Sequence, residues 1–471
     1  MVVSAFFRRL TRFAVAATAL PLALVCLPAH AHVKWFAPYA VGASPQPVGL
    51  TLTNTWFWTG VALVLFFFLL ARLIERSDAG EKILRGLDRA SNPLWGRLDD
   101  FVRLVIAAFF VAIFTVGGTY LTPEMHTRHE WVPWLQLLIA ALIFSRRTQP
   151  LAAAGIIVLW LLALRDYGLF HLLDYLALCV GVAGYLALEA SARPQWRERR
   201  FEVLRWGIAI ALMWSSVEKF AYPDWFYPVI EERPYLTFVM SRDTFIPMAG
   251  VAEFTLGFGL IWTPLVRRFS AIALFVIFMV AVYPFGRIDL IGHALILVTM
   301  VAVAADRTRE NHFLPKLKQA LTGVPAGLVT ALLIFIAGYW GLHTMIYGVE
   351  GRAGPVRDAR FPGMDLNDIT SADPSATAML ALPTAQEANH AVMERMDGPM
   401  MEGMMHPDPD VAFALGMVPH HQGAIDMSMI VLKFGKDPQN QRLAREIIQE
   451  QQHQIDQMRE WLRQRNIPQP P

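Results

Sequence analysis

The sequence predicts an all-α protein in which a polytopic helical membrane domain of about ten spans precedes a small helical bundle. Composition is the first indication: 55% of the 471 residues are hydrophobic and only 17% are charged. That is more apolar than an ordinary soluble domain. The second is a series of apolar runs near the length that a transmembrane helix needs. The third is a C-terminal segment with the start signals of three successive helices.

The N-terminal residues 1–31 are predicted to be a secretory signal peptide. They combine a basic start, an apolar core and an A-x-A cleavage site at 29–31. Cleavage would leave His32 at the N-terminus, where its amine and imidazole can together bind copper. Alternatively, His32 merely follows a permissive cleavage site. The mature chain would keep only Cys179, which rules out a disulfide framework.

The membrane domain is predicted over residues 32–348. A spanning helix needs about 20 apolar residues. The runs that meet or approach this length are 54–73, 104–121, 131–145, 151–164, 169–189, 204–220, 246–263, 269–284, 288–304 and 324–343. The runs 131–145 and 151–164 are short, and a re-entrant hairpin is the alternative for them.

Positive charge is concentrated in alternate connections between these runs. Basic residues gather in 72–103, at 146–147, in 193–200, at 267–268 and in 307–318, whereas the intervening connections are poorer in them. Because cytoplasmic loops carry the excess of Lys and Arg, these five connections are predicted to lie inside. We therefore expect a multi-pass protein of the bacterial inner membrane, embedded in lipid, with its C-terminal part in the periplasm. The net charge of +2 gives no electrostatic case for a nucleic-acid partner.

The C-terminal part is predicted to be a linker, 349–383, followed by a bundle, 384–471. Thr384 and Glu387 form a capping box that opens a helix to about Met396. Asp408-Pro409 begins a second helix that ends near Phe434, and Asp437-Pro438 begins a third that ends near Arg463. Short connections between helices favour an antiparallel bundle.

Methionine and histidine are concentrated in this bundle. The candidate metal ligands are Met400, Met401, Met404, Met405 and His406 before the second helix, Met417, His420, His421 and Met427 within it, and His453 and Met458 in the third. Thioether and imidazole are the ligands that favour copper, above all Cu(I), while zinc stays possible through histidines and carboxylates. Along the second helix, Met417, His420 and Met427 share a face by their spacing. The competing interpretation is that its methionines simply fill the core.

These residues carry a resemblance to a known family. Residues 408–462 resemble the ferritin-like domain-of-unknown-function 305 family through Asp410, Phe413, Met417, His420, His421, Ala424, Met427, Leu443, Ala444, Ile447, Ile448, Gln451, Ile455, Met458, Trp461 and Leu462. The resemblance implies a helical bundle with metal ligands among its Met and His residues, as in periplasmic copper-binding members of the CopM type. It transfers ligand roles to Met417, His420, His421 and Met427. Gln454 departs from the family, which commonly has an acid there.

Ionisable residues also lie within the apolar runs. Glu218, Glu253 and His293 are costly in hydrocarbon and therefore suggest function. We expect them to share a polar pocket that opens outward, unless a glutamate pairs with His293 or Lys219 merely to fix helix packing. The segments around them, 213–220, 249–257 and 292–294, weakly resemble the DoxX-like family, some relatives of which are implied to be quinone-linked oxidoreductase subunits.

The leading functional hypothesis is a non-enzymatic copper-handling protein whose periplasmic bundle captures copper for binding, tolerance or transfer. A periplasmic copper protein is a possible partner. The sequence contains no ATP-binding loop, which disfavours a primary pump. The alternatives are a DoxX-like quinone-linked electron-transfer subunit, or a membrane-anchored sensor or scaffold.

Overall fold

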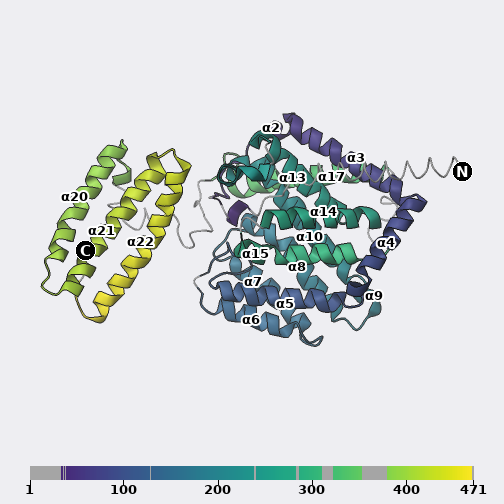
Figure 1. Ribbon diagram of the computed structural model, residues 1–471, viewed down its shortest axis with the longest axis horizontal. Helices are drawn as coiled ribbons and strands as arrows, with labels where there is room; N and C mark the ends of the chain where they lie inside the picture. The colour runs from purple at the N-terminus through teal and green to yellow at the C-terminus, as the bar shows by residue number, and fades with distance from the viewer. Residues whose placement is uncertain are drawn as a thin grey trace. The chain divides into compact units, whose positions relative to one another are not determined.

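The computed structural model describes residues 33–35, 37, 39–127, 129–237, 240–282, 286–309, 322–352 and 379–468. In this part of the chain every named element is a helix, which confirms the all-α prediction. The chain divides into two compact units, Met1–Gly354 and Pro355–Pro471. We call them the helical body and the C-terminal bundle (Figure 1). The predicted signal peptide, His32 and residues 353–378 of the predicted linker lie outside the described residues.

Each of the ten apolar runs coincides with a helix of the helical body. These helices are α3 (Thr55–Glu75), α5 (Leu98–Val116), α6 (Val132–Leu142), α7 (Gln149–Ala163), α8 (Leu169–Glu189), α10 (Arg200–Ser216), α13 (Arg242–Gly259), α14 (Pro264–Val282), α15 (Arg287–Ala305) and α17 (Gly323–Tyr347). Further helices precede or join them: η1 (Val33–Trp35), α2 (Val48–Thr53), α4 (Asp78–Trp95), α9 (Pro194–Arg197), α11 (Glu218–Ala221), η2 (Pro223–Phe226), α12 (Tyr227–Glu232) and η3 (Pro234–Thr237).

Four of these helices are long and apolar enough to cross a membrane: α3, α8, α15 and α17. At 11 and 15 residues, α6 and α7 fall short of the about 20 residues required. The hairpin alternative for these two helices therefore stays open. A count of ten spans remains a prediction.

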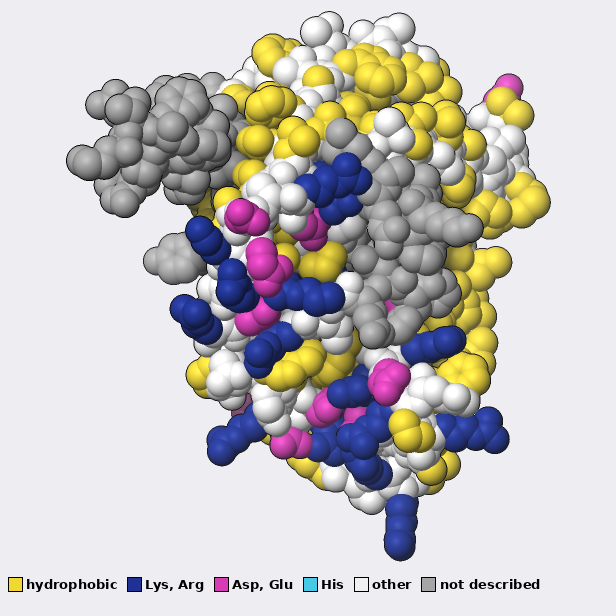
Figure 2. All heavy atoms as spheres, turned by 90° about the vertical axis from the view of Figure 1, so that its right-hand side faces the viewer, with side chains coloured by type: hydrophobic (Ala, Val, Ile, Leu, Met, Phe, Trp, Pro, Cys, Tyr) yellow, Lys and Arg dark blue, Asp and Glu magenta, His cyan; other side chains and the backbone are white. Residues whose placement is uncertain are grey.

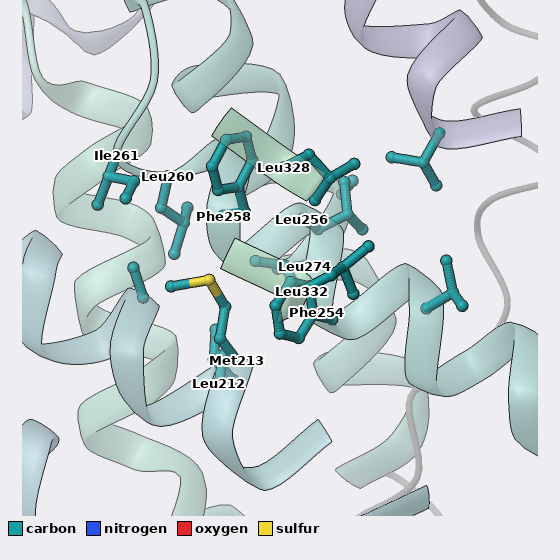
Figure 3. Packing of buried hydrophobic residues seen from close by; sticks show 14 of the residues in the cluster. Leu212, Met213, Phe254, Leu256, Phe258, Leu260, Ile261, Leu274, Leu328 and Leu332 are labelled. Carbon is teal, nitrogen blue, oxygen red and sulfur yellow. The ribbon is translucent and has the colours of Figure 1, made fainter. Parts of the chain in front are cut away.

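One large core cluster of the helical body is built mainly from α3, α10, α13, α14 and α17, and a second from α5, α6, α7, α8 and α15. Leu212 and Met213 of α10 lie beside Phe254 of α13, with Leu274 of α14 and Leu332 of α17 in the same cluster (Figure 3). Elsewhere, α8 and α10 approach each other closely at Gly181 and Gly207, because a Cβ on Gly207 would lie 2.6 Å from Gly181 Cα. Small residues allow such backbone contact between apolar helices.

The connections that were predicted to lie inside are joined by ion pairs at one end of the helical body, which we call the arginine-rich end. Arg146 binds Glu189 at 3.2 Å, Arg200 binds Asp99 at 2.7 Å, Arg205 binds Asp306 at 2.8 Å and Arg268 binds Asp88 at 2.6 Å. Figure 2 shows Lys and Arg side chains gathered on this face, with acidic side chains among them. This clustering agrees with the alternation that the sequence predicts.

The C-terminal bundle contains three long helices, α20 (Ala385–Met404), α21 (Pro409–Phe434) and α22 (Pro438–Gln464). The predicted caps form: the Glu387 backbone N–H donates to Thr384 Oγ1 at 3.2 Å, and that of Asp410 donates to Asp408 Oδ1 at 2.9 Å. Ile425 and Met429 of α21 pack with Ile448 and Ile455 of α22 in the core.

One boundary differs from the prediction, because the first helix continues to Met404 instead of ending near Met396. The segment from Met396 to Met405, in which methionines are spaced with glycines and acids, is predicted from the sequence to be a loop. Close packing of this segment against α21 outweighs that local preference, as the contacts below show.

Candidate functional site

Methionines of α20 line its contact with α21. A Cβ on Gly423 would lie 2.4 Å from Met396 Sδ, and one on Gly416 would lie 2.6 Å from Met404 Cγ. The two glycines therefore provide the space in which these side chains lie. Because Met396 and Met404 are eight residues apart, they fall on nearly the same side of α20. This packing explains why the helix persists through the expected loop.

Other thioethers near the end of α20 remain accessible. Met401 is 55% exposed, Met404 57% and Met405 78%, whereas Met400 is half-buried. His406 follows directly and is exposed, with its Nδ1 accepting the Asp408 backbone N–H at 3.1 Å. The exposure of three methionines within five positions is not what core packing would produce. They are free to take a soft metal ion.

Met417, His420 and Met427 lie on the outer side of α21. Met417 is half-buried, His420 is exposed and Met427 is 38% exposed; Phe413, also on this face, is 63% exposed. His420 therefore does not face the bundle interior. Since adjacent residues on a helix are separated by about 100°, only one of His420 and His421 can point fully inward. His421 takes that position, with 7% of its surface exposed.

The buried imidazole of His421 has a defined orientation. Its Nε2 lies 2.6 Å from Gln454 Oε1 of α22. The orientation of that amide is fixed in turn, because Gln454 Nε2 donates to Glu450 Oε1 at 2.7 Å. An amide oxygen only accepts, so the proton of a neutral His421 ring belongs on Nε2. Nδ1 then carries the lone pair, and within the described residues this buried atom has no hydrogen-bond partner.

Sequence reasoning missed the ion pair that joins α20 to α21. Arg395 binds Asp426, which is almost completely buried and also accepts from Gln422 Nε2 at 3.2 Å. A single aspartate between apolar neighbours in a helix was the available signal. Of the ligands predicted in α22, Met458 is half-buried against apolar residues, while the side chain of His453 lies outside the described residues.

These positions define the metal chemistry that the bundle can offer. In the described part of the chain, no three His, Cys, Asp or Glu side chains gather as a metal site. Methionine thioethers beside His421 are the other soft donors that the described part of the bundle offers. Met417 lies one turn before His421, so the thioether and the imidazole are neighbours on α21. A mixed sulfur and nitrogen donor set suits Cu(I) better than zinc.

A second polar cluster lies inside the helical body. Lys34 of η1 is buried, pairs with Asp174 of α8, and lies 2.5 Å from Glu218 Oε1 of α11. Trp214 Nε1 donates to the other oxygen of Asp174 at 2.9 Å. Burial would lower the pKa of Lys34, but Asp174 and Glu218 outweigh it and raise that pKa above its ordinary value. The sequence did not indicate that a lysine ahead of the first apolar run would reach this position.

The predicted intramembrane residues lie around the same cavity. Asp174, Glu218, Glu253 and His293 all line a cavity of about 60 Å³, which is large enough for a few water molecules. Lys219 Nζ binds Glu253 at 2.5 Å, which is the lysine–glutamate pair foreseen as the packing alternative. His293 Nδ1 lies 3.1 Å from the Asp289 carboxylate. We call this cavity the polar chamber.

A further acid near the polar chamber was not foreseen. Glu124 lies in the connection between α5 and α6 and is buried. His171 Nε2 lies 2.9 Å from its Oε1, and the Tyr175 hydroxyl donates to the same oxygen. The imidazole of His171 is thus held by this buried acid.

The fold and the two clusters define a class of protein: a helical body with helices able to cross a membrane, joined to a helical bundle that presents methionine and histidine. Comparison with known families adds that residues 410–471 match the domain of unknown function DUF305. The resemblance predicted for this region is thus confirmed. No curated protein and no solved structure matches the chain. The DoxX-like resemblance of the helical body stays a prediction.

Proposed function

We propose that this chain is a copper-handling protein of the bacterial inner membrane, in which the C-terminal bundle captures Cu(I) in the periplasm. The observation that carries the proposal is the arrangement around His421. Its buried Nδ1 has no hydrogen-bond partner among the described residues, and Met417 lies one turn away along α21. Histidine ligands are usually held by a hydrogen bond on their second nitrogen, and Gln454 provides one here. The DUF305 match of this region is consistent with such a bundle.

The exposed methionines would be the first groups to bind Cu(I). Met401, Met404 and Met405 are accessible at the end of α20, beside the chain segment that leads into α21. Thioethers bind Cu(I) without deprotonation and resist oxidising surroundings that would oxidise thiolates. A Cu(I) ion would be taken up by these accessible thioethers and held more firmly at His421 and Met417.

A Cu(I) competition titration of the purified full-length protein tests this proposal. Replacing Met401 and Met405 with leucine keeps side-chain volume while removing sulfur, and their exposure makes an effect on folding small. We expect fewer Cu(I) ions bound per chain. The matched control replaces Met279 and Met345 of the helical body, which are also exposed, with leucine. Equal Cu(I) binding by both double variants would contradict capture by the bundle methionines.

The polar chamber favours a second candidate function, that of a proton-exchanging redox subunit. Its walls offer carboxylates and an imidazole, which suit protons and hard cations better than Cu(I). Glu253 and His293 would then carry protons during quinone-linked electron transfer. This function predicts quinone-dependent turnover in purified membranes and its loss in Glu253→Gln. Absence of turnover in the native protein would eliminate it and leave copper capture unaffected.

A further inference from the structure

Helix α4 has the character of a helix that lies along a membrane surface. It follows α3, whose composition allows it to cross a membrane, after a short turn at the arginine-rich end. Leu84 is buried against the body and Ile83 and Leu87 are half-buried, whereas Lys82 and Arg85 are exposed. Helices with one apolar and one basic side characteristically occupy the interface between lipid and water.

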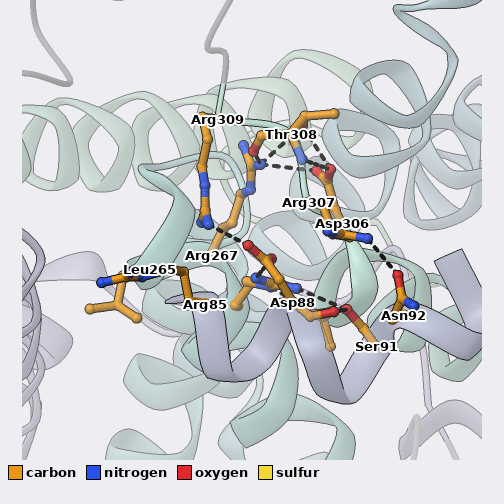
Figure 4. Close-up of polar contacts among 12 residues, drawn as sticks. Arg85, Asp88, Ser91, Asn92, Leu265, Arg267, Asp306, Arg307, Thr308 and Arg309 are labelled. Carbon is orange, nitrogen blue, oxygen red and sulfur yellow. Dashed lines mark hydrogen bonds and ion pairs between the residues drawn. The ribbon is translucent and has the colours of Figure 1, made fainter. Parts of the chain in front are cut away.

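A surface pocket lies between α4 and the segment that follows α15. It has a volume of about 410 Å³ and is lined by Arg85, Asp88, Arg89, Asn92 and Arg307. Figure 4 shows Arg85, Asp88 and Asn92 on α4, with Arg307 reaching toward Asn92 from the opposite side. Three arginines from two separate segments therefore surround one hollow, which we call the arginine pocket.

Asp88, the one acid among the described residues that line the arginine pocket, is already paired. Asp88 binds Arg268 at 2.6 Å through one oxygen and Arg309 at 2.5 Å through the other. It therefore cannot balance the charge of the pocket arginines. The carboxylate of Asp88 is thus shared by two guanidinium groups that are not among the lining residues.

The pocket arginines retain their positive charge. Arg307 donates to the neutral amide of Asn92 at 2.8 Å. Arg85 is 3.6 Å from Glu81, in a pair so exposed that it is worth little. Among the described residues, Arg89 makes no ion pair with an acid. A surface pocket with excess positive charge favours the binding of an anion.

We propose that the arginine pocket binds the phosphate group of an anionic phospholipid from the inner leaflet. This inference rests on the membrane placement given under the proposed function, and it is independent of copper. Guanidinium groups match phosphate oxygens in pairs. A lipid is favoured over a soluble phosphate because Leu73, 54% exposed in the last turns of α3, places apolar surface near the start of α4. Basic pockets at the cytoplasmic side of membrane helices bind such headgroups.

The test is a lipid titration of the purified full-length protein in neutral detergent, followed by native mass spectrometry. The probes are phosphatidylglycerol, phosphatidylcholine and inorganic phosphate. We expect phosphatidylglycerol to bind preferentially and its affinity to fall about 100-fold in the triple variant Arg85→Gln, Arg89→Gln, Arg307→Gln, since each surface arginine contributes roughly a five-fold factor. The double variant that keeps Arg307 should lose about 25-fold by the same reasoning, and it spares the contact with Asn92.

A charge-matched control distinguishes lipid binding in the arginine pocket from general electrostatic attraction between the protein and anionic lipid. Lys82, Arg97 and Arg147 are exposed and lie outside the arginine pocket, and replacing all three with glutamine removes the same charge. That control should keep native phosphatidylglycerol affinity. The proposal is overturned by equal losses in both variants, by equal binding of phosphatidylcholine, or by displacement of the lipid by equimolar inorganic phosphate. Cu(I) binding by the triple variant should be unchanged, so failure here would not bear on copper capture.

Discussion

His421 Nε2 and Gln454 Oε1 lie 2.6 Å apart and join α21 to α22 inside the C-terminal bundle. This contact fixes which nitrogen of the imidazole carries the proton. It leaves Nδ1 buried, with a lone pair and no hydrogen-bond partner among the described residues. A buried polar atom without a partner is costly, so its presence in the core favours a role in ligand binding.

Gln454→Leu should weaken Cu(I) binding by about 10- to 100-fold, the usual effect of losing a hydrogen-bond partner of a metal-ligating histidine. Gln454→Glu should retain or strengthen binding, because a carboxylate holds the same tautomer more firmly. Competition against a chromophoric Cu(I) chelator measures both. Equal affinities in the two variants would remove Gln454 from the metal site.

Gly403→Ala should destabilise the C-terminal bundle. A Cβ there would lie 2.5 Å from the backbone carbon of Leu415, and backbone cannot move aside as a flexible side chain can. The expected loss in free energy of unfolding is about 1–3 kcal/mol. Chemical denaturation followed by circular dichroism measures it.

Gly398→Ala provides the matched control on the same helix. Its Cβ would meet nothing within 4 Å, so alanine should stabilise α20 by up to about 1 kcal/mol. Opposite signs for the two substitutions are expected. If both stabilise the bundle, the close approach of α20 and α21 is not present in solution.

Arg395→Met should destabilise the bundle by about 3–5 kcal/mol, since it leaves the buried carboxylate of Asp426 without its cation. The double variant Arg395→Met, Asp426→Leu should recover most of that loss, because an apolar pair can replace a buried ion pair. A double-mutant cycle in denaturant measures the coupling. Additive losses would show that the two side chains do not interact.

Lys34→Met should lower the melting temperature of the full-length protein, because Asp174 and Glu218 would remain buried without their shared cation. The sign of the pH dependence follows from the raised pKa of Lys34. Its contribution is fully present below the ordinary pKa of 10.5 and is lost only as pH rises through the higher folded value. The difference from native protein should therefore not shrink between about pH 8.5 and 10. A difference that shrinks within this range would contradict the pairing.

Local signals in the sequence identified most of the helices. Apolar runs, and helix caps such as Thr384 and Asp408, are patterns formed by residues that are close in sequence. The structure has helices at the positions that these patterns indicate. The end of α20 could not be found in this way, because Gly398 and Pro399 predict a loop that contact with Gly416 and Gly423 overrides. Tertiary packing decides such boundaries, and it is not visible in a local pattern.

The candidate sites were only partly foreseeable. Spacing placed Met417 and His420 on one face, but which face α22 covers depends on packing, so His421 and not His420 proved to be buried. Glu253 and His293 were recognisable as charges within apolar runs. Lys34 was not, because its contact with Asp174 joins residues 140 positions apart. The sequence shows what chemistry each residue type can perform, but it does not show which residue far away in the chain each one contacts.

The most direct test of copper capture is a Cu(I) competition titration of the full-length protein, with zinc as the comparison metal and with His421→Asn and His420→Asn measured separately. We expect Cu(I) to bind far more tightly than zinc, with the larger loss of affinity in His421→Asn. Of these two histidines, His421 is the one with a buried nitrogen that has no hydrogen-bond partner among the described residues. Circular dichroism would check that both variants keep their helices. Native Cu(I) affinity in a folded His421→Asn variant would contradict the proposed metal site.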